Sequence, residues 1–216
     1  MHRIITDIFS IARFLNNARL LSFPKNSKIA VMKKIITFLS VILFAFGANA
    51  ASNPFMGNAQ NQITFYLGQG VDNGYIVPMP DKPVPFYIAQ VKYSQPASFF
   101  RMPARISMNL AETAGFGKKY GWNWTDFTIP IFFLSGDTAL LYGENWYAGI
   151  GSGIGMQAQE NDRLGAKLLF EFRLFYGYHI NENWDIELYA QHFSNANTAE
   201  ENHSYAFFGL GIARNF

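Results

Sequence analysis

The sequence has 216 residues, with 17 Lys+Arg, 15 Asp+Glu, no Cys and a formal net charge of +2. The first 50 residues carry seven of the basic residues and one of the acidic residues, so positions 51–216 hold 10 basic and 14 acidic residues, a net charge of −4. A main segment without a basic surplus argues against a nucleic-acid-binding protein. The lack of cysteine excludes disulfides, thiolate zinc sites and cysteine nucleophiles.

The N-terminal part has the pattern of a targeting sequence. Lys33 and Lys34 follow Met32 and precede a largely apolar run over 35–46, and residues 48–50 read Ala-Asn-Ala. A basic start, a short apolar run and an A-x-A ending are typical of a secretory signal peptide, and the run is too short for a permanent transmembrane helix. A buried N-terminal helix, the alternative, accounts for neither the two lysines nor the Ala-Asn-Ala ending.

We therefore expect cleavage after Ala50 and a bacterial envelope location. The predicted division is 1–31 as an upstream extension or misassigned start, 32–50 as the signal peptide and 51–216 as the mature domain. A mature chain of 166 residues is long enough for one domain or one small barrel.

Hydrophobic residues in the mature part recur with a period of two, which predicts β-strands. In 166–180 the even positions are apolar or aromatic, while the odd positions include charges of both signs. The segments 146–157 and 184–192 alternate in the same way. One face of each segment combines charges with glycines, as a narrow polar lumen requires, and the other is broad and aromatic, as lipid contact requires. A soluble sandwich would instead hide its apolar face between two sheets.

Eight such segments predict an all-β fold, an eight-stranded antiparallel transmembrane β-barrel. Closure of the barrel removes every strand edge, as lipid demands. The chain ends in Phe216, with apolar residues at 208, 210 and 212 on the same face, which resembles the C-terminal signature of outer-membrane barrels. The expected strands are 61–70, 86–95, 104–114, 126–134, 146–158, 166–180, 183–194 and 204–216.

Connection lengths predict how the barrel is oriented. The connection at 181–183 is tight, whereas those at 70–85 and 195–203 are longer. In outer-membrane barrels the termini and the short turns face the periplasm. The end of the seventh strand, with His192 and Ser194, is therefore expected near the outer leaflet. These two residues lie two apart, so they share the face assigned to lipid, where polar side chains are costly unless the strand has reached the headgroups.

The run 192–197, His-Phe-Ser-Asn-Ala-Asn, followed by Asn202, resembles the H-x-S-N motif of the lipid A 3-O-deacylase (PagL) family. The resemblance implies an outer-membrane barrel that removes the ester-linked 3-O-acyl chain of lipid A. It implies that His192 is the general base and Ser194 the nucleophile, with no metal and no cofactor. The side chains of Asn195 and Asn202, or backbone N–H groups near Asn197, are candidates to stabilise the oxyanion.

The third member of the triad is unresolved, because this sequence departs from the family pattern. The family often has a Glu shortly before Ser-Tyr, but His203 precedes Ser204 here. Glu201 is the candidate acid and Glu200 the alternative, and a solvated acidic loop explains either of them equally well. A His-Ser dyad supported by Asn or a backbone carbonyl is a further alternative.

Other residues have interpretations that depend on the expected barrel. Basic residues of the expected outer loops are candidates to meet lipid A phosphates, although solvated loop charges explain them equally well: Lys118, Lys119, Arg163 and Lys167. Tryptophans suit the interfacial girdles: Trp122, Trp124, Trp146 and Trp184. Charged residues are expected to fill the lumen: Lys167, Glu171, Arg173, Asp185 and Glu187. Glycines on the inner face are expected to relieve packing: Gly149, Gly151, Gly153 and Gly155.

The sequence therefore predicts an outer-membrane serine esterase, with lipopolysaccharide and membrane lipid as its partners and no nucleic acid. Two alternatives stay open: a structural or adhesive small barrel, and a lipid A acyltransferase. A homodimer is considered as the oligomeric state, which the sequence does not determine.

Overall fold

The structure is a computed structural model. Contacts divide the chain into two units, Met1–Val41 and Ile42–Phe216, and all described residues belong to the second. The expected extension 1–31 and most of the expected signal peptide lie outside the described residues, so the division at Ala50 stays a prediction. In the described part of the chain, no helix is long and apolar enough to cross a membrane. The described residues are 46–47, 53–55, 61–71, 83–115, 118–119, 122–123, 127–161, 163–200 and 203–216.

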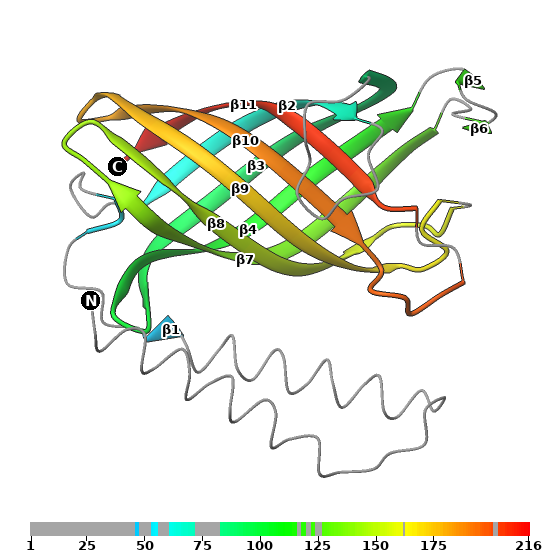
Figure 1. Cartoon of the computed structure of the whole chain (residues 1–216), viewed down its shortest axis with the longest axis horizontal. Coiled ribbons are helices and arrows are strands. Elements are labelled where there is room, and N and C mark those ends of the chain that lie inside the picture. The colour runs from blue at the N-terminus through cyan, green and yellow to red at the C-terminus, as the bar shows by residue number, and fades with distance from the viewer. Residues whose placement is uncertain are drawn as a thin grey trace, which may run out of the picture. The chain divides into compact units, whose positions relative to one another are not determined.

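Eight long antiparallel strands form a closed barrel (Figure 1), which confirms the predicted fold. Each strand pairs with its neighbours along the chain, and the first long strand, β2, pairs with the last, β11. The short β1 (Phe46–Gly47) pairs with the end of β3, and β5 (Lys118–Lys119) pairs with β6 (Trp122–Asn123) between β4 and β7. The barrel strands are β2 (Gln62–Val71), β3 (Pro83–Phe99), β4 (Met102–Gly115), β7 (Phe127–Tyr142), β8 (Trp146–Gln157), β9 (Leu168–Asn181), β10 (Trp184–Ser194) and β11 (Tyr205–Asn215).

The two ends of the barrel differ in their connections. Tight turns at 100–101, 143–145 and 182–183 lie at one end, which we call the turn end. The barrel's termini meet there, since Phe216 N–H donates to Asn61 O at 3.0 Å. The strand ends that the longer connections join lie at the other end, called the loop end; these connections are 72–82, 116–126, 158–167 and 195–204. The short turns and the termini therefore share one end, as predicted, and in outer-membrane barrels this end faces the periplasm.

The outer wall of the barrel is apolar and carries aromatic residues near the turn end. Trp146 stacks on Tyr176 with 6.2 Å between ring centroids, and the Arg214 guanidinium lies 5.7 Å from the Trp184 ring. Both tryptophans are partly exposed, as expected for an interfacial girdle, while the side chains of Trp122 and Trp124 lie outside the described residues. Exposed apolar side chains on the strands include Phe65, Leu67, Val91, Met108, Leu110, Phe132, Leu134, Ile150, Leu188, Leu210 and Ile212.

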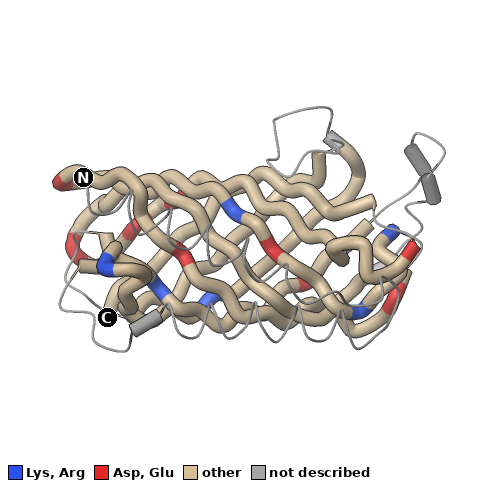
Figure 2. Tube along the Cα trace, turned by 60° about the horizontal axis from the view of Figure 1, so that its bottom comes forward, with Lys and Arg blue, Asp and Glu red and all other residues tan. Residues whose placement is uncertain are grey.

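Charged residues occur along the whole trace (Figure 2), but within the eight strands almost all of them face inward. The two that are exposed, Glu112 and Arg214, lie close to strand ends. Lys167 was expected in the lumen, and this expectation was wrong, because it precedes β9 and is exposed. The buried charged residues of the strands are Lys92, Arg105, Asp137, Glu171, Arg173, Asp185 and Glu187.

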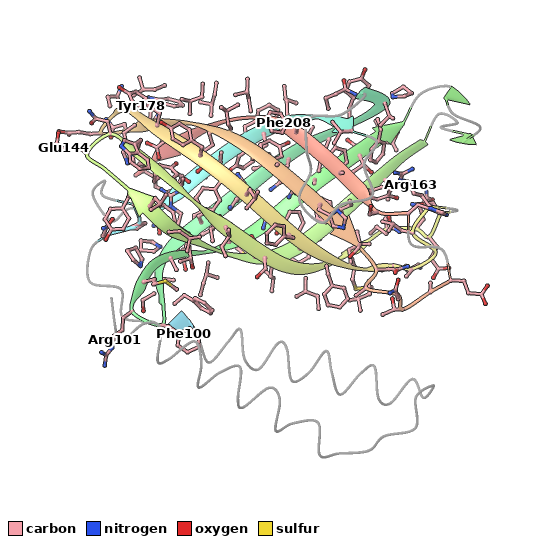
Figure 3. All side chains as sticks on the ribbon, in the orientation of Figure 1. Phe100, Arg101, Glu144, Arg163, Tyr178 and Phe208 are labelled. Atoms are coloured by element: carbon pink, nitrogen blue, oxygen red, sulfur yellow. The ribbon has the colours of Figure 1, made fainter. Side chains whose placement is uncertain are left out.

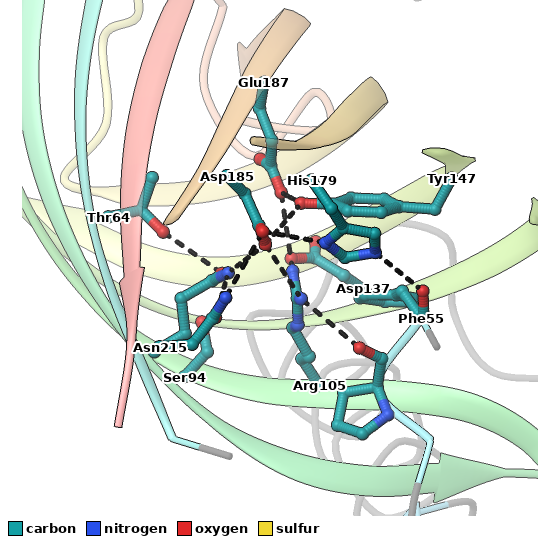
Figure 4. Close-up of polar contacts among 12 residues, drawn as sticks. Phe55, Thr64, Ser94, Arg105, Asp137, Tyr147, His179, Asp185, Glu187 and Asn215 are labelled. Atoms are coloured by element: carbon teal, nitrogen blue, oxygen red, sulfur yellow. Dashed lines mark hydrogen bonds and ion pairs between the residues drawn. The ribbon is translucent and has the colours of Figure 1, made fainter. Parts of the chain in front are cut away.

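Glu187 is one of the buried carboxylates of the polar network inside the barrel, and Figure 4 draws it with Asp185, Arg105 and Tyr147. Its carboxylate accepts hydrogen bonds from the hydroxyls of Tyr66 at 2.6 Å and Tyr147 at 2.7 Å. Arg173 donates to it at 2.7 Å, and Arg105 donates at 3.4 Å. Burying a carboxylate is costly unless it is paired and hydrogen-bonded, and four donors on four strands meet that condition here.

Residues 53–55 close the network at the turn end (Figure 4). Phe55 is fully buried and stacks on Tyr147, with 5.0 Å between centroids, beneath the Arg105 guanidinium 4.1 Å away. Arg105 also donates to the carbonyl of Pro54 at 3.4 Å, and His179 Nε2 lies 3.1 Å from the carbonyl of Phe55. Residues 53–55, which precede β2 in the chain, therefore extend the barrel's core at the turn end.

The inner face is not polar throughout. Near the loop end, Phe86 packs on Tyr205 and Phe207, each with 4.9 Å between ring centroids, and Phe133 packs on Phe193 at 5.2 Å. The sequence predicted a polar lumen, whereas the structure also buries aromatic rings in it, among polar pairs such as Gln191 and Glu171. Eight strands enclose so little space that side chains fill it, and buried rings fill it without needing partners for polar atoms.

The glycines of β8 leave room for inward-pointing side chains of neighbouring strands, as expected. A Cβ at Gly151 would lie 2.2 Å from Asp137 Oδ1, and one at Gly153 would lie 2.6 Å from Glu171 Oε2. Asp137, in turn, forms an ion pair with Lys92. A larger residue at either glycine would therefore displace a buried carboxylate.

Strands β3 and β7 continue farther toward the turn end than predicted. Pro96 interrupts the strand signal in β3, but β2 reaches only to Ser94, so the missing N–H of Pro96 leaves no bond to β2 unmade. In β7, the register shifts between Ala139 and Leu141, which breaks the period-two pattern.

We predict that Glu187→Gln destabilises the barrel, because Arg105 and Arg173 then face a neutral amide in a buried site. The free energy of unfolding should fall by about 3 kcal/mol. Urea unfolding in lipid vesicles, followed by tryptophan fluorescence, measures the change. Glu112→Gln makes the same substitution on the exposed wall and should leave stability unchanged; equal effects of the two variants would contradict the role given to the network.

Candidate functional site

His192 and Ser194 lie at the loop end of β10 and face away from the lumen. The alternating residues Gln191 and Phe193 are fully buried inside, so the two candidate residues share the opposite, outward side. His192 is nevertheless only 7% exposed, and Ser194 is half-buried. The expected side of the strand is confirmed, but the imidazole is shielded rather than open to lipid.

The strands next to β10 surround this pair with apolar residues. His192 pairs in register with Phe172 on β9 and with Ala206 on β11, and Ser194 pairs with Phe170 on β9. Neither register partner of His192 is acidic, so an acid that orients the imidazole has to come from elsewhere. Ala190, the residue before His192 on the same outward side of β10, is buried as well.

The candidate acids belong to the connection 195–204. Glu200 is exposed, and Glu201 lies outside the described residues together with Asn202. The structure thus brings His192 and Ser194 to one face of a strand and leaves the acid as a prediction.

Asn195 holds the turn that follows Ser194. Its side chain is fully buried, donates to the carbonyl of Leu164 and accepts from Asn197 N–H at 2.8 Å. Its carbonyl accepts from Thr198 N–H at 3.1 Å and from the Thr198 hydroxyl at 2.8 Å. Ala196 and Asn197 both have positive φ, 51° and 60°, a strained backbone that such bonds keep in place.

A second turn, 161–165, packs beside this connection, and the sequence reasoning missed it. The side chain of Asn161 accepts from the N–H groups of Arg163 and Leu164, at 2.9 and 3.1 Å. Gly165 has a φ of 53° and donates its N–H to Asn161 O at 2.8 Å. An Asn that starts a turn and a Gly that ends it are a readable signal. Leu164 is fully buried and belongs to the cluster of inward-facing residues.

The basic residues of the loops divide into different environments. Arg163 donates to Ser204 O at 2.6 Å, whereas Lys167 is exposed; the side chains of Lys118 and Lys119 lie outside the described residues. Figure 3 places Arg163 at the loop end, opposite Glu144 and Tyr178 at the turn end. Among the described residues, no group of three or more His, Asp or Glu side chains is arranged to hold a metal ion.

Comparisons with known proteins give a family and a fold. The family model described as lipid A 3-O-deacylase (PagL) matches residues 89–215. No curated protein sequence matches the chain. The crystal structure of Neisserial surface protein A (NspA) is similar with a TM-score of 0.51 and 8% identity, covering 74% of this chain and 99% of that one. At this identity the likeness supports the barrel fold alone.

Two further structures are similar at lower TM-scores. The N-terminal β-barrel domain of Pseudomonas aeruginosa OprF has a TM-score of 0.49 and 11% identity, covering 74% of this chain and 99% of that one. The outer membrane enzyme PagL has a TM-score of 0.46 and 17% identity, covering 72% of this chain and 99% of that one.

We predict that Asn195→Asp loosens the turn after Ser194, because a carboxylate cannot donate to the carbonyl of Leu164. Leaving that buried carbonyl without its donor costs about 1–3 kcal/mol locally. Hydrogen exchange of amides 195–200 should become faster, while the strands stay protected. Asn181→Asp, at the exposed end of β9 on the opposite side of the barrel, is the control. Unchanged exchange at 195–200 in Asn195→Asp would contradict the prediction.

Proposed function

The chain belongs to the lipid A 3-O-deacylase (PagL) family, and from this premise we propose that it is an esterase that removes the 3-O-linked acyl chain of lipid A in lipopolysaccharide. The match over residues 89–215 is the observation that carries the proposal, because it runs from β3 to β11 and includes His192 and Ser194. The protein is located in the bacterial outer membrane. The proposed substrate is an amphiphile of the same membrane, which reaches an outward-facing site from the lipid.

In the proposed reaction, His192 is the general base and Ser194 the nucleophile. The imidazole accepts the hydroxyl proton as the Ser194 oxygen attacks the ester carbonyl, and it then returns the proton to the leaving 3-oxygen of the sugar. Water hydrolyses the acyl-enzyme, with His192 again as base. Placement on the same face of β10 supports this pairing, and the shielding of His192 supports a site with little competing water.

The oxyanion requires donors, and the three asparagines take different roles in the proposal. Asn195 and Asn197 are engaged with each other in the turn, so we assign them to its support. Asn202, which lies outside the described residues, stays the candidate donor from a side chain. The acid also stays a proposal, with Glu201 preferred and Glu200 as the alternative. We look for it in the loop because the register partners of His192 on the adjacent strands, Phe172 and Ala206, are not acidic.

We predict that Ser194→Ala and His192→Ala each lower deacylation by about a thousandfold or more, because each removes a partner of the attacking pair. Mass spectrometry of lipid A from cells expressing each variant should show the 3-linked chain retained. Ser152→Ala, which alters another serine of the outer wall on β8, should behave as wild type.

The same spectra separate the competing functions. Deacylation that persists in Ser194→Ala would overturn the assignment of the nucleophile. Lipid A that is identical with and without the wild-type protein would favour a structural or adhesive barrel, and an additional acyl chain would favour acyl transfer. A homodimer stays a prediction.

We predict that only one of the two loop glutamates affects catalysis. If Glu201 orients His192, Glu201→Gln should lower kcat by about 10²-fold, because a neutral amide stabilises the imidazolium less well. The exposed Glu200→Gln should retain full activity. Measuring kcat for both variants on purified lipid A decides between the two residues, and full activity of both would favour the His-Ser dyad.

A further inference from the structure

The β10–β11 connection, which follows Ser194, forms hydrogen bonds with the β8–β9 connection at both of its ends. At its start, Asn195 donates to the carbonyl of Leu164. At its end, Arg163 Nε donates to the carbonyl of Ser204 at 2.6 Å, and His203 N–H donates to the carbonyl of Arg163 at 2.8 Å. The adjacent residues Arg163 and Leu164 of the β8–β9 connection thus bind both the start and the end of the β10–β11 connection.

The turn that presents these two residues is itself rigidly supported. Asn161 caps it with both its side-chain oxygen and its carbonyl, and its side-chain amide hydrogen-bonds to the Tyr205 hydroxyl. Gln157, the last residue of β8, donates to the carbonyl of Ala166 at 2.7 Å. Leu164 is fully buried. The turn therefore has little freedom to follow movements of the neighbouring connection.

The backbone that Arg163 holds leads directly to the strand beside His192. Ser204 has a φ of 48°, a left-handed conformation that is unfavourable for serine. Two residues later, Ala206 is the register partner of His192. An arginine in an outer loop is usually a solvated charge or a contact for lipid headgroups. The Nε of Arg163 instead donates to the backbone carbonyl of Ser204.

We propose that Arg163 is a positioning residue for the His192–Ser194 pair: by holding Ser204 it fixes the backbone that leads into β11 and so the start of β11 beside the imidazole. This inference rests on the proposed function. It predicts an effect on the chemical step, because a small displacement of a catalytic pair lowers the rate without weakening substrate binding.

The test compares kcat and KM of purified wild type, Arg163→Ala and Arg163→Lys on lipid A. Arg163→Ala should lower kcat about tenfold or more while KM stays within about twofold of wild type. Arg163→Lys, which retains a charged donor, should recover part of kcat at unchanged KM. Glu160→Gln, on an exposed residue of the same connection, should match wild type.

Heat-modifiable mobility on gels shows whether each variant is folded. If Arg163→Ala does not fold, Arg163→Gln takes its place, with an expected loss of kcat at unchanged KM. A kcat equal to wild type would overturn the inference, and so would a raised KM at unchanged kcat, which would mark a contact with substrate. Ser194→Ala serves as the inactive reference. An inactive wild type would instead count against the proposed function itself.

Discussion

Lipid offers no hydrogen bonds to a strand edge, so the sheet has to pair its first long strand with its last, and the β2–β11 ladder does this over nine register pairs. With eight strands the enclosed space is narrow, and this determines the interior. Charged side chains placed there by the period-two pattern have to find partners inside the lumen, as Glu187 on β10 does with Arg105 on the opposite strand β4. The glycines of β8 follow from the same limit, because neighbouring side chains occupy the space where their Cβ atoms would lie.

A filled interior also determines where chemistry can take place. No substrate can enter a lumen occupied by Phe133, Phe193 and Phe207, so a reactive pair has to lie on the outer wall or in the loops. His192 meets this condition, since it shares β10 with lumen residues but faces the other way. The wall around it consists of strand residues in fixed register, while the adjoining connections supply the polar groups. The proposed site therefore lies where the strands of the barrel wall meet the hydrogen-bonded connections of the loop end.

Much of the fold follows from the sequence, because alternation is a local signal. All eight strands, most of their inward residues and the division into a turn end and a loop end could be predicted from it, but Lys167 was wrongly placed in the lumen. The extensions of β3 and β7 could not, since a proline and a register shift interrupt the pattern. The contacts of Phe55 and Arg163 were missed for a different reason: both residues bind partners that are far away in the chain. The order of residues along the sequence carries no signal for such contacts.

The inward-facing cluster runs from Phe55 at the turn end to Leu164 at the loop end. Both residues are fully buried and apolar, and the buried charges between them are largely paired. An ion that enters from the loop end would have to shed its hydration shell against the buried aromatic rings there. The barrel should therefore conduct poorly, and a cell can hold many copies in its outer membrane without losing control over the passage of small solutes.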